Sequence, residues 1–269
     1  MYLIASKQGV LTGRQLAKNL NLLFSTDVEK IKVNSEIVIR YGNAQLSNRI
    51  SKDTDCNSRD SILRMSAKHK LWSYLEDTDI LSPRYYRVNE IPDDLNFPCF
   101  SREKLHRLGQ DIKVINTPRE ITVDAEYIVP FYPTLREYRV HVVYGKVVKV
   151  LRKYPIGDFA NDMIRTSAFG WHYKLSNLEQ IMCVKSMLEI AKETAKILDA
   201  NFCGIDMAWS AKDNGLNRWI VWEVNSAPSL NSSSLELYTE ILKEHLAERL
   251  QFSDIHKSDE NNGLSYPYN

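Results

Sequence analysis

The sequence predicts a mixed α+β fold, in which helices and short strands alternate along most of the chain. Residues 1 to about 66 combine short apolar strands, such as Tyr2-Leu-Ile-Ala, with a helix that Thr12 could cap. Short strands separated by turns dominate residues 97–152, and a strand, loop, strand and helix follow over residues 202–250. This mixture favours helices packed on sheets around a shared core.

Helical periodicity accounts for the remaining long segments. One helix is expected from about Ser61 to Leu75, before Pro83 prevents any continuation. A second is expected from Leu178 to Leu198, where apolar residues recur at helical spacing. The polar segment from Phe252 to the end loses this periodicity, and we expect residues 252–269 to be a mobile tail.

Composition excludes several classes of protein. The 35 basic and 34 acidic residues nearly balance, which argues against a protein that coats nucleic acid through charge. No apolar run reaches the length that crosses a bilayer, and no membrane partner is expected. The four cysteines are widely spaced and the histidines lack zinc-site spacing, so we expect reduced core thiols, a cytoplasmic location and no zinc.

A hairpin near the C-terminus predicts a metal site. If Asn214-Gly215 forms a type I′ turn, counting outward places Asp206 directly opposite Glu223. Side chains alternate along a strand, so Asn225 shares the face of Glu223. Directly opposed like charges destabilise a sheet, and a hard divalent cation with oxygen ligands would compensate them. The alternative is a looser turn with both acids on a solvated face.

A second hairpin carries cations. Placing Tyr144-Gly145 in a tight turn pairs Val143 with Lys146 and, farther along, Glu137 with Arg152. The face of Arg152 then also carries Glu137, Arg139 and His141. Guanidinium groups suit bidentate contact with phosphate or carboxylate. The alternative is an ordinary ion pair between Glu137 and Arg152 at the surface, which would contribute little.

The order of these segments resembles the ATP-grasp superfamily, in particular the branch of carboxylate–amine ligases that includes ribosomal-protein glutamate ligases and phage-encoded relatives. The resemblance covers about residues 57–245. It is carried by KLWSYLEDTDILSP from Lys70, FPCFSREKLHRLGQDI, AEYIVPF, EYRVHVVYGKVVKVLRK, IRTSAFGW and FCGIDMAW…WIVWEVNSAPSLNSSSLELY. The last motif is the most specific, because it combines an acid on one strand with Glu-x-Asn on the next.

The resemblance implies an ATP-grasp fold and a division of the chain into domains. An N-terminal α/β domain would span residues 1–66, a small central lid residues 67–132, and a larger C-terminal subdomain with the metal site residues 133–251. ATP would be clamped between the last two. The lid loop is normally glycine-rich, but here KLHRLGQDI offers only Gly109, which leaves its effect on phosphate binding open.

The resemblance also implies roles for individual residues. Asp206, Glu223 and Asn225 match the family's magnesium ligands, which Mn²⁺ could also use. Cations matched to the phosphates, the reacting carboxylate and the acyl-phosphate are Arg139, Arg152 and Arg165. Residues matched to nucleotide binding are Lys70 and Arg102 for the phosphates, and Glu126, Tyr127, Ile128 and Val129 for the adenine and ribose.

The implied activity is a carboxylate–amine ligase that uses ATP and releases ADP and phosphate. The sequence leaves open whether the acid donor and the amine acceptor are small molecules, peptides or larger molecules such as a modified nucleic acid, and it does not reveal the oligomeric state. The alternative is an ATP-binding module without ligase turnover that engages a macromolecular partner. The opposed acids argue against that alternative, since a module that only binds has little reason to keep them.

Overall fold

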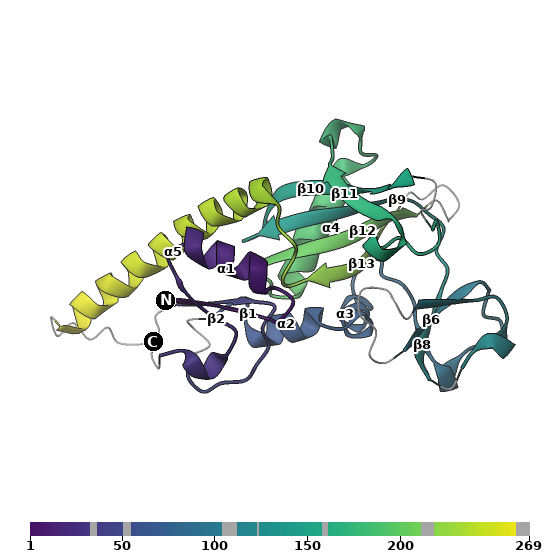
Figure 1. Cartoon of the computed structure of the whole chain (residues 1–269), viewed down its shortest axis with the longest axis horizontal. Coiled ribbons are helices and arrows are strands. Elements are labelled where there is room, and N and C mark those ends of the chain that lie inside the picture. The colour runs from purple at the N-terminus through teal and green to yellow at the C-terminus, as the bar shows by residue number, and fades with distance from the viewer. Residues whose placement is uncertain are drawn as a thin grey trace. The chain divides into compact units, whose positions relative to one another are not determined.

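A computed structural model describes residues 1–32, 37–50, 55–103, 112–122, 124–157, 161–210 and 218–261. The chain divides into two compact units, one of Asp60–Ser226 and one that joins Met1–Arg59 to Ala227–Asn269. Helices and sheets occur in both units (Figure 1), so the predicted mixed α+β class is confirmed. No helix within the described ranges is both long and apolar enough to cross a membrane.

The unit that contains the N-terminus is built on a four-stranded parallel sheet with the order β2-β1-β3-β4. Every residue of β1 and β3 is buried, as expected of parallel strands with both faces covered. The elements of this unit are β1 Tyr2–Ala5, α1 Val10–Asn19, β2 Leu23–Ser25, η1 Val28–Lys30, β3 Val38–Tyr41, β4 Asp55–Cys56 and α5 Ser232–Asn261.

Helix α5 is longer than the sequence pattern predicts. The Asn231 side chain accepts a hydrogen bond from the backbone N–H of Ser234 at 3.0 Å, which caps the first turn. The helix continues to Asn261, so residues 252–261 are helical, and the mobility of the segment from Phe252 stays a prediction. The segment 252–261 contains no glycine or proline to end a helix, and the first such residue is Gly263. Residues 262–269 lie outside the described part.

The second unit opens with two short helices where one was predicted. Helix α2 spans Arg59–Met65 and α3 spans Lys68–Leu75, because Ala67 between them is extended, with φ of −133° and ψ of 131°. Trp72 on α3 donates a hydrogen bond from Nε1 to the backbone carbonyl of Trp222 at 3.1 Å. The break therefore lets α3 dock independently of α2.

Two antiparallel sheets complete this unit (Figure 1). The smaller has the order β5-β8-β6-β7 and consists of β5 Tyr86–Arg87, β6 Cys99–Glu103, β7 Ile112–Ile115 and β8 Ala125–Pro130, with η3 Val88–Glu90 and η4 Pro118–Glu120 beside it. The larger has the order β11-β10-β9-β12-β13 and consists of β9 Thr134–Val143, β10 Lys146–Pro155, β11 Trp171–Leu175, β12 Phe202–Ser210 and β13 Arg218–Asn225.

Helix α4, Val184–Ile197, packs against strands β9, β10, β12 and β13 of the larger sheet. It begins later than the predicted Leu178, because a separate 3₁₀ turn, η7, occupies Leu178–Gln180 and Cys183 adopts a left-handed conformation. The apolar face of the sheet is fully buried at Val140, Ile205, Met207 and Val221. The other face therefore carries the polar side chains.

The predicted division of the chain into domains at residues 66, 132 and 251 stays a prediction.

Candidate active site

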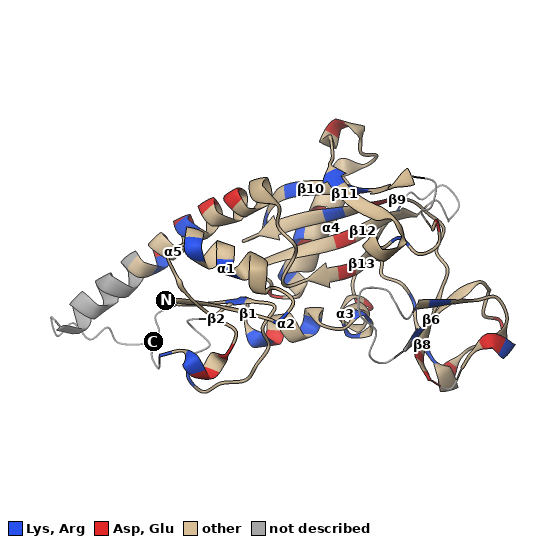
Figure 2. Cartoon of the chain, viewed as in Figure 1, with Lys and Arg blue, Asp and Glu red and all other residues tan. Residues whose placement is uncertain are grey.

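Strands β12 and β13 bring the predicted metal ligands together. Asp206 pairs directly with Glu223, so the predicted opposition of the two acids is confirmed. Each strand carries one acidic residue, drawn red in Figure 2. Asn225 follows two positions after Glu223, pairs with Gly204 and lies on the same face. The predicted turn at Asn214-Gly215 lies outside the described residues.

The register between these strands is not continuous. A shift between Asp206 and Met207 pairs Met207 with Val221 instead of Trp222, which an uninterrupted hairpin would place there. The shift is the pattern of a β-bulge, with one extra residue on β13. Its effect is to keep Met207 and Val221 together on the buried face while the two acids stay opposed on the polar face.

Each acid is neutralised by a cation. Arg139 on β9 donates to both oxygens of Asp206, with Nε–Oδ1 at 2.6 Å and Nη2–Oδ2 at 2.7 Å. Lys68 at the start of α3 places Nζ 2.8 Å from Oε2 of Glu223. This arrangement resolves the repulsion that two opposed carboxylates would otherwise cause.

The pKa values of this group follow from burial and these contacts. Burial alone would raise the pKa of Glu223, but Lys68, with Arg139 and Arg102 in support, lowers it to about 2. Burial would likewise lower the pKa of Arg139, but Asp206 outweighs it and raises that pKa above its ordinary value. Glu223 is therefore ionised at neutral pH and available as an oxygen ligand.

A second ion cluster lies on the same face of the sheet. Lys153 Nζ lies 2.7 Å from Oε2 of Glu137 and also donates to the backbone carbonyl of Arg165 at 2.7 Å. Arg165 places Nη1 3.7 Å from Oε1 of Glu137, donates to the carbonyl of Thr134 at 2.9 Å, and stacks 4.9 Å from the ring centre of Trp171. An acid, a backbone carbonyl and an aromatic ring therefore fix the position of the Arg165 side chain.

Tyr173 on β11 joins the two groups of ions. Its ring lies 4.6 Å from the Arg139 guanidinium carbon and 5.3 Å from Lys153 Nζ. Burial raises the pKa of Tyr173 well above its ordinary value, so its hydroxyl stays protonated. The sequence analysis missed this residue because it predicted no strand at residues 171–175.

The predicted position of Arg152 is wrong. The tight turn itself is confirmed, since Tyr144 and Gly145 have φ of 46° and 72° and Lys146 pairs with Val143. A register shift between Val147 and Lys149 then pairs Arg152 with Tyr138 instead of Glu137. The shift places Val150 on the buried face and Lys149 on the polar face, and it carries Arg152 to the face opposite the acids. Lys153 pairs with Glu137 instead.

The predicted nucleotide-binding residues lie on α3 and the smaller sheet. Lys70 is exposed, and Lys68, two positions earlier, contacts Glu223 instead. Arg102 is only 8% exposed, and its Nε atom has no hydrogen-bond partner within the described part of the chain. Burial lowers the pKa of Arg102, and Tyr127 and Glu223 partly offset this effect. Glu126, Tyr127, Ile128 and Val129 occupy the centre of β8, with the last three buried.

Comparison with known proteins identifies the family. A family model described as the RimK-like ATP-grasp domain matches residues 105–249, more than half of the chain. The chain belongs to this RimK-like ATP-grasp family. A comparison with curated protein sequences finds no significant match.

Solved ATP-grasp structures share the fold. D-alanine–D-alanine ligase from Bacillus anthracis aligns over 95% of this chain and 99% of its own, with a TM-score of 0.63 at 14% identity. The ATP-grasp ligase PsnB, solved with a minimal precursor, aligns over 93% and 98%, with a TM-score of 0.61 at 13% identity. N5-carboxyaminoimidazole ribonucleotide synthetase from Thermotoga maritima aligns over 83% and 67%, with a TM-score of 0.56 at 14% identity. The predicted ATP-grasp fold is thereby confirmed.

The donor set of this ATP-grasp chain fits a hard divalent cation. Two carboxylates and one amide side chain lie on adjacent strands, and the amide nitrogen of Asn225 is buried without a hydrogen-bond partner among the described residues. Among the described residues, no group of three or more His, Cys, Asp or Glu side chains forms a cage. Phosphate oxygens and water would have to complete the coordination, which is the usual arrangement for Mg²⁺.

Lys68 and Lys153 are the functional candidates that sequence reasoning overlooked. A one-residue irregularity in the backbone near each of them decides which neighbouring side chain faces the acids. For Lys153, the signal was the segment Lys146-Val-Val-Lys149, in which strict alternation would force the Lys149 charge onto the buried face. For Lys68, nothing in the local pattern marks the extended Ala67 that sets its direction.

Proposed function

We propose that this protein is an ATP-dependent carboxylate–amine ligase that forms an amide bond through an acyl-phosphate and releases ADP and phosphate. One arrangement carries the proposal: Asp206 and Glu223 are directly opposed, and each is neutralised by a cation that could move to a phosphate. A pair of acids held this way has a clear use in binding a metal–nucleotide complex.

The nucleotide would be bound by residues of α3 and both sheets. Asp206, Glu223 and Asn225 would hold Mg²⁺ or Mn²⁺, which when bound supplies charge neutralisation on the transferred phosphoryl group. Lys68 and Arg102 would contact the phosphates, because both lie close enough to lower the pKa of Glu223. The backbone and acid of Glu126–Val129 on β8 would hold the adenine and ribose. Lys70 would contribute little to nucleotide binding.

The acid substrate would be handled by the cations on the same face. Arg139, Lys153 and Arg165 would orient a carboxylate for attack on the γ-phosphorus, which would give the acyl-phosphate and ADP. The amine then attacks the acyl carbon, the C–N bond forms as the C–O bond to phosphate breaks, and phosphate departs with the amine's proton passing to solvent. No protein nucleophile is needed, and exclusion of water protects the acyl-phosphate.

The related structures support nucleotide use and leave the substrate open. The Bacillus anthracis ligase has been solved with ATP, and PsnB with a precursor peptide and AMPPNP. Both small amino acids and peptides are therefore candidate donors or acceptors for this chain. A cytoplasmic location fits its use of ATP.

Trapping with hydroxylamine tests the reaction class. Pools of amino acids, short acidic peptides and simple dicarboxylates are incubated with enzyme, Mg²⁺, ATP and hydroxylamine, and hydroxamate, ADP and AMP are measured. We expect a hydroxamate with stoichiometric ADP, both abolished in Glu223→Gln. Formation of AMP and pyrophosphate would contradict phosphorylation of the carboxylate. Tight ATP binding with no product in any pool, and no ADP release on adding macromolecular cell extract, would favour a module that only binds.

A further inference from the structure

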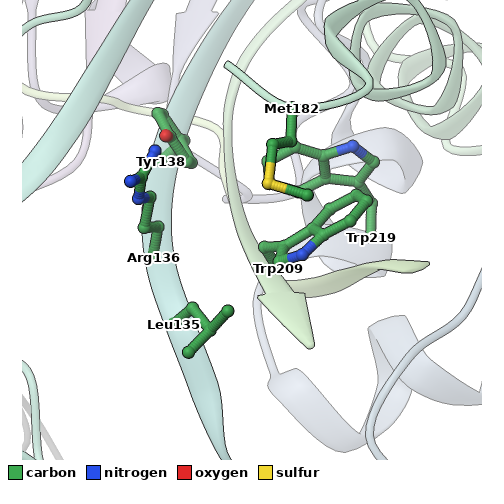
Figure 3. A pocket seen from close by; sticks show the side chains of 6 residues that line it. All are labelled: Leu135, Arg136, Tyr138, Met182, Trp209 and Trp219. Carbon is green, nitrogen blue, oxygen red and sulfur yellow. The ribbon is translucent and has the colours of Figure 1, made fainter. Parts of the chain in front are cut away.

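A small aromatic pocket lies on the face of the larger sheet opposite Asp206 and Glu223. Strand register places Trp209 beside Trp219 on one side and Arg136 on the other. The pocket has a volume of about 70 Å³ and is lined by Leu135, Arg136, Tyr138, Met182, Trp209 and Trp219. Figure 3 shows both indoles and Met182 grouped on one side, with the other three residues along the neighbouring strand.

The floor and the rim of this pocket differ in exposure. Trp209, Trp219 and Tyr138 are 2–4% exposed and pack edge to face, with ring centres 4.8 Å apart for the two indoles. Leu135 and Met182 at the rim are 62% and 52% exposed. A rigid aromatic floor beneath exposed aliphatic side chains is suited to receive one apolar side chain of a partner.

Cations flank the pocket without acids to neutralise them. Arg152 pairs directly with Lys174 on the neighbouring strand, and both lie over the ring of Tyr154, at 4.6 and 5.7 Å. Neither they nor the exposed Arg136 forms a salt bridge within the described part of the chain. Two like charges directly opposed on a sheet are unfavourable, so an anionic partner would stabilise this edge.

We propose that this face docks an acidic peptide segment of a protein partner, with one apolar side chain in the pocket and carboxylates on Arg136 and on the Arg152–Lys174 pair. Arg152 is paired with Tyr138 of the pocket floor, so Lys174 lies two strands away, roughly 10 Å at the usual strand spacing. That distance corresponds to about three residues of extended peptide. The partner therefore carries an acid about three positions from its apolar anchor.

A peptide fits this surface better than a nucleic acid. Binding of single strands relies on open aromatic faces for base stacking, whereas the pocket rings are almost fully buried. The chain's near-zero net charge also gives little general attraction for a phosphate backbone. The surface lies on the other side of the sheet from the candidate active site, so the inference goes beyond the proposed ligase activity.

Peptide binding without ATP or Mg²⁺ tests the proposal separately from catalysis. Fluorescein-labelled ten-residue Ser/Gly peptides carry one Leu or Trp and two Glu at spacings of one to five residues, with matched Lys and Gln versions, and binding is followed by anisotropy. We expect binding of the Glu peptides, strongest near a spacing of three, and none of the Lys peptides. Arg136→Glu and Lys174→Glu should each weaken it about fivefold, as for one partly exposed charge contact.

Lys146→Glu provides a matched control, because Lys146 is an exposed lysine at the opposite end of β10. It should leave the dissociation constant within twofold, whereas Met182→Glu at the pocket rim should weaken binding as strongly as the two charge reversals. The proposal is overturned if no Glu peptide binds at millimolar concentration, if the Lys peptides bind equally, or if Lys146→Glu is as damaging. Displacement by ATP alone, or tighter binding of oligothymidylate than of any peptide, would also overturn it.

Discussion

Replacing Lys68 should damage the site far more than replacing Lys70. Lys68 Nζ lies 2.8 Å from Oε2 of Glu223, and the two side chains are 24% and 36% exposed. At that distance, the Coulomb energy is roughly 6 kcal/mol for an effective dielectric constant of 20. Desolvation, solvent screening and side-chain entropy offset most of it, so about 1 kcal/mol of net stability remains. Lys70 is exposed, and its loss should cost almost nothing.

The assay compares Lys68→Met with Lys70→Met by urea denaturation and by calorimetric titration with Mg²⁺-ATP. Lys68→Met should lose about 1 kcal/mol of unfolding free energy at pH 7, and the pKa of Glu223 should rise from about 2. Its dissociation constant for ATP should increase about tenfold, as for loss of one charge-assisted contact to phosphate. Lys70→Met should stay within twofold. Equal losses in both variants, or a larger loss in Lys70→Met, would refute the assignment of Lys68.

Three further predictions concern the polar face. Lys153→Met should lower the rate of ADP release at least tenfold while Arg152→Met stays within twofold, because only Lys153 faces the acids. Arg165→Gln should lower kcat with an unchanged dissociation constant for ATP, since it is expected to act on the acyl-phosphate. Burial lowers the pKa of His141 to about 4 from 6.5, so the unfolded chain binds the proton first on acidification. Stability should therefore fall from pH 6.5 towards 4, by roughly 2 kcal/mol at pH 5, and His141→Gln should flatten urea midpoints measured from pH 7 to 5.

Local turn chemistry predicted part of the site correctly. The glycine in Tyr144-Gly145 permits the positive φ that a tight hairpin needs, and it fixed the first pair of that hairpin. The opposition of Asp206 and Glu223 was likewise obtained by counting from a turn. It held although the pairs nearer the turn, such as Ser210 with Arg218, are shifted by one residue from that count, because the bulge between Asp206 and Met207 restores the register. Counting from a turn therefore gives the correct pair only where the bulges between the turn and that pair are taken into account.

Tertiary packing determined the irregularities that counting residues from a turn did not predict. On β10, burial of Val150 beside Val140 outweighs regular pairing, and the resulting bulge exchanges the faces of Arg152 and Lys153. The extended Ala67 similarly divides one predicted helix and brings Lys68 to Glu223. Both irregularities are set by contacts with distant segments, which a local sequence pattern does not contain. The predicted glycine-poor lid loop, residues 104–112, lies outside the described residues except for Ile112.

Binding of Mn²⁺ tests most directly whether the two opposed acids hold the metal of a nucleotide complex. Free Mn²⁺ is followed by electron paramagnetic resonance in the presence of AMPPNP, for the unaltered protein and for Glu223→Gln. Glu223 is the better target, because Asp206→Asn would leave the buried Arg139 without its carboxylate and destabilise the fold. We expect Glu223→Gln to weaken Mn²⁺ binding at least tenfold while the free energy of unfolding falls by no more than about 1 kcal/mol, the contribution of the ion pair with Lys68. Equal Mn²⁺ affinity in the two proteins would contradict a metal site between β12 and β13.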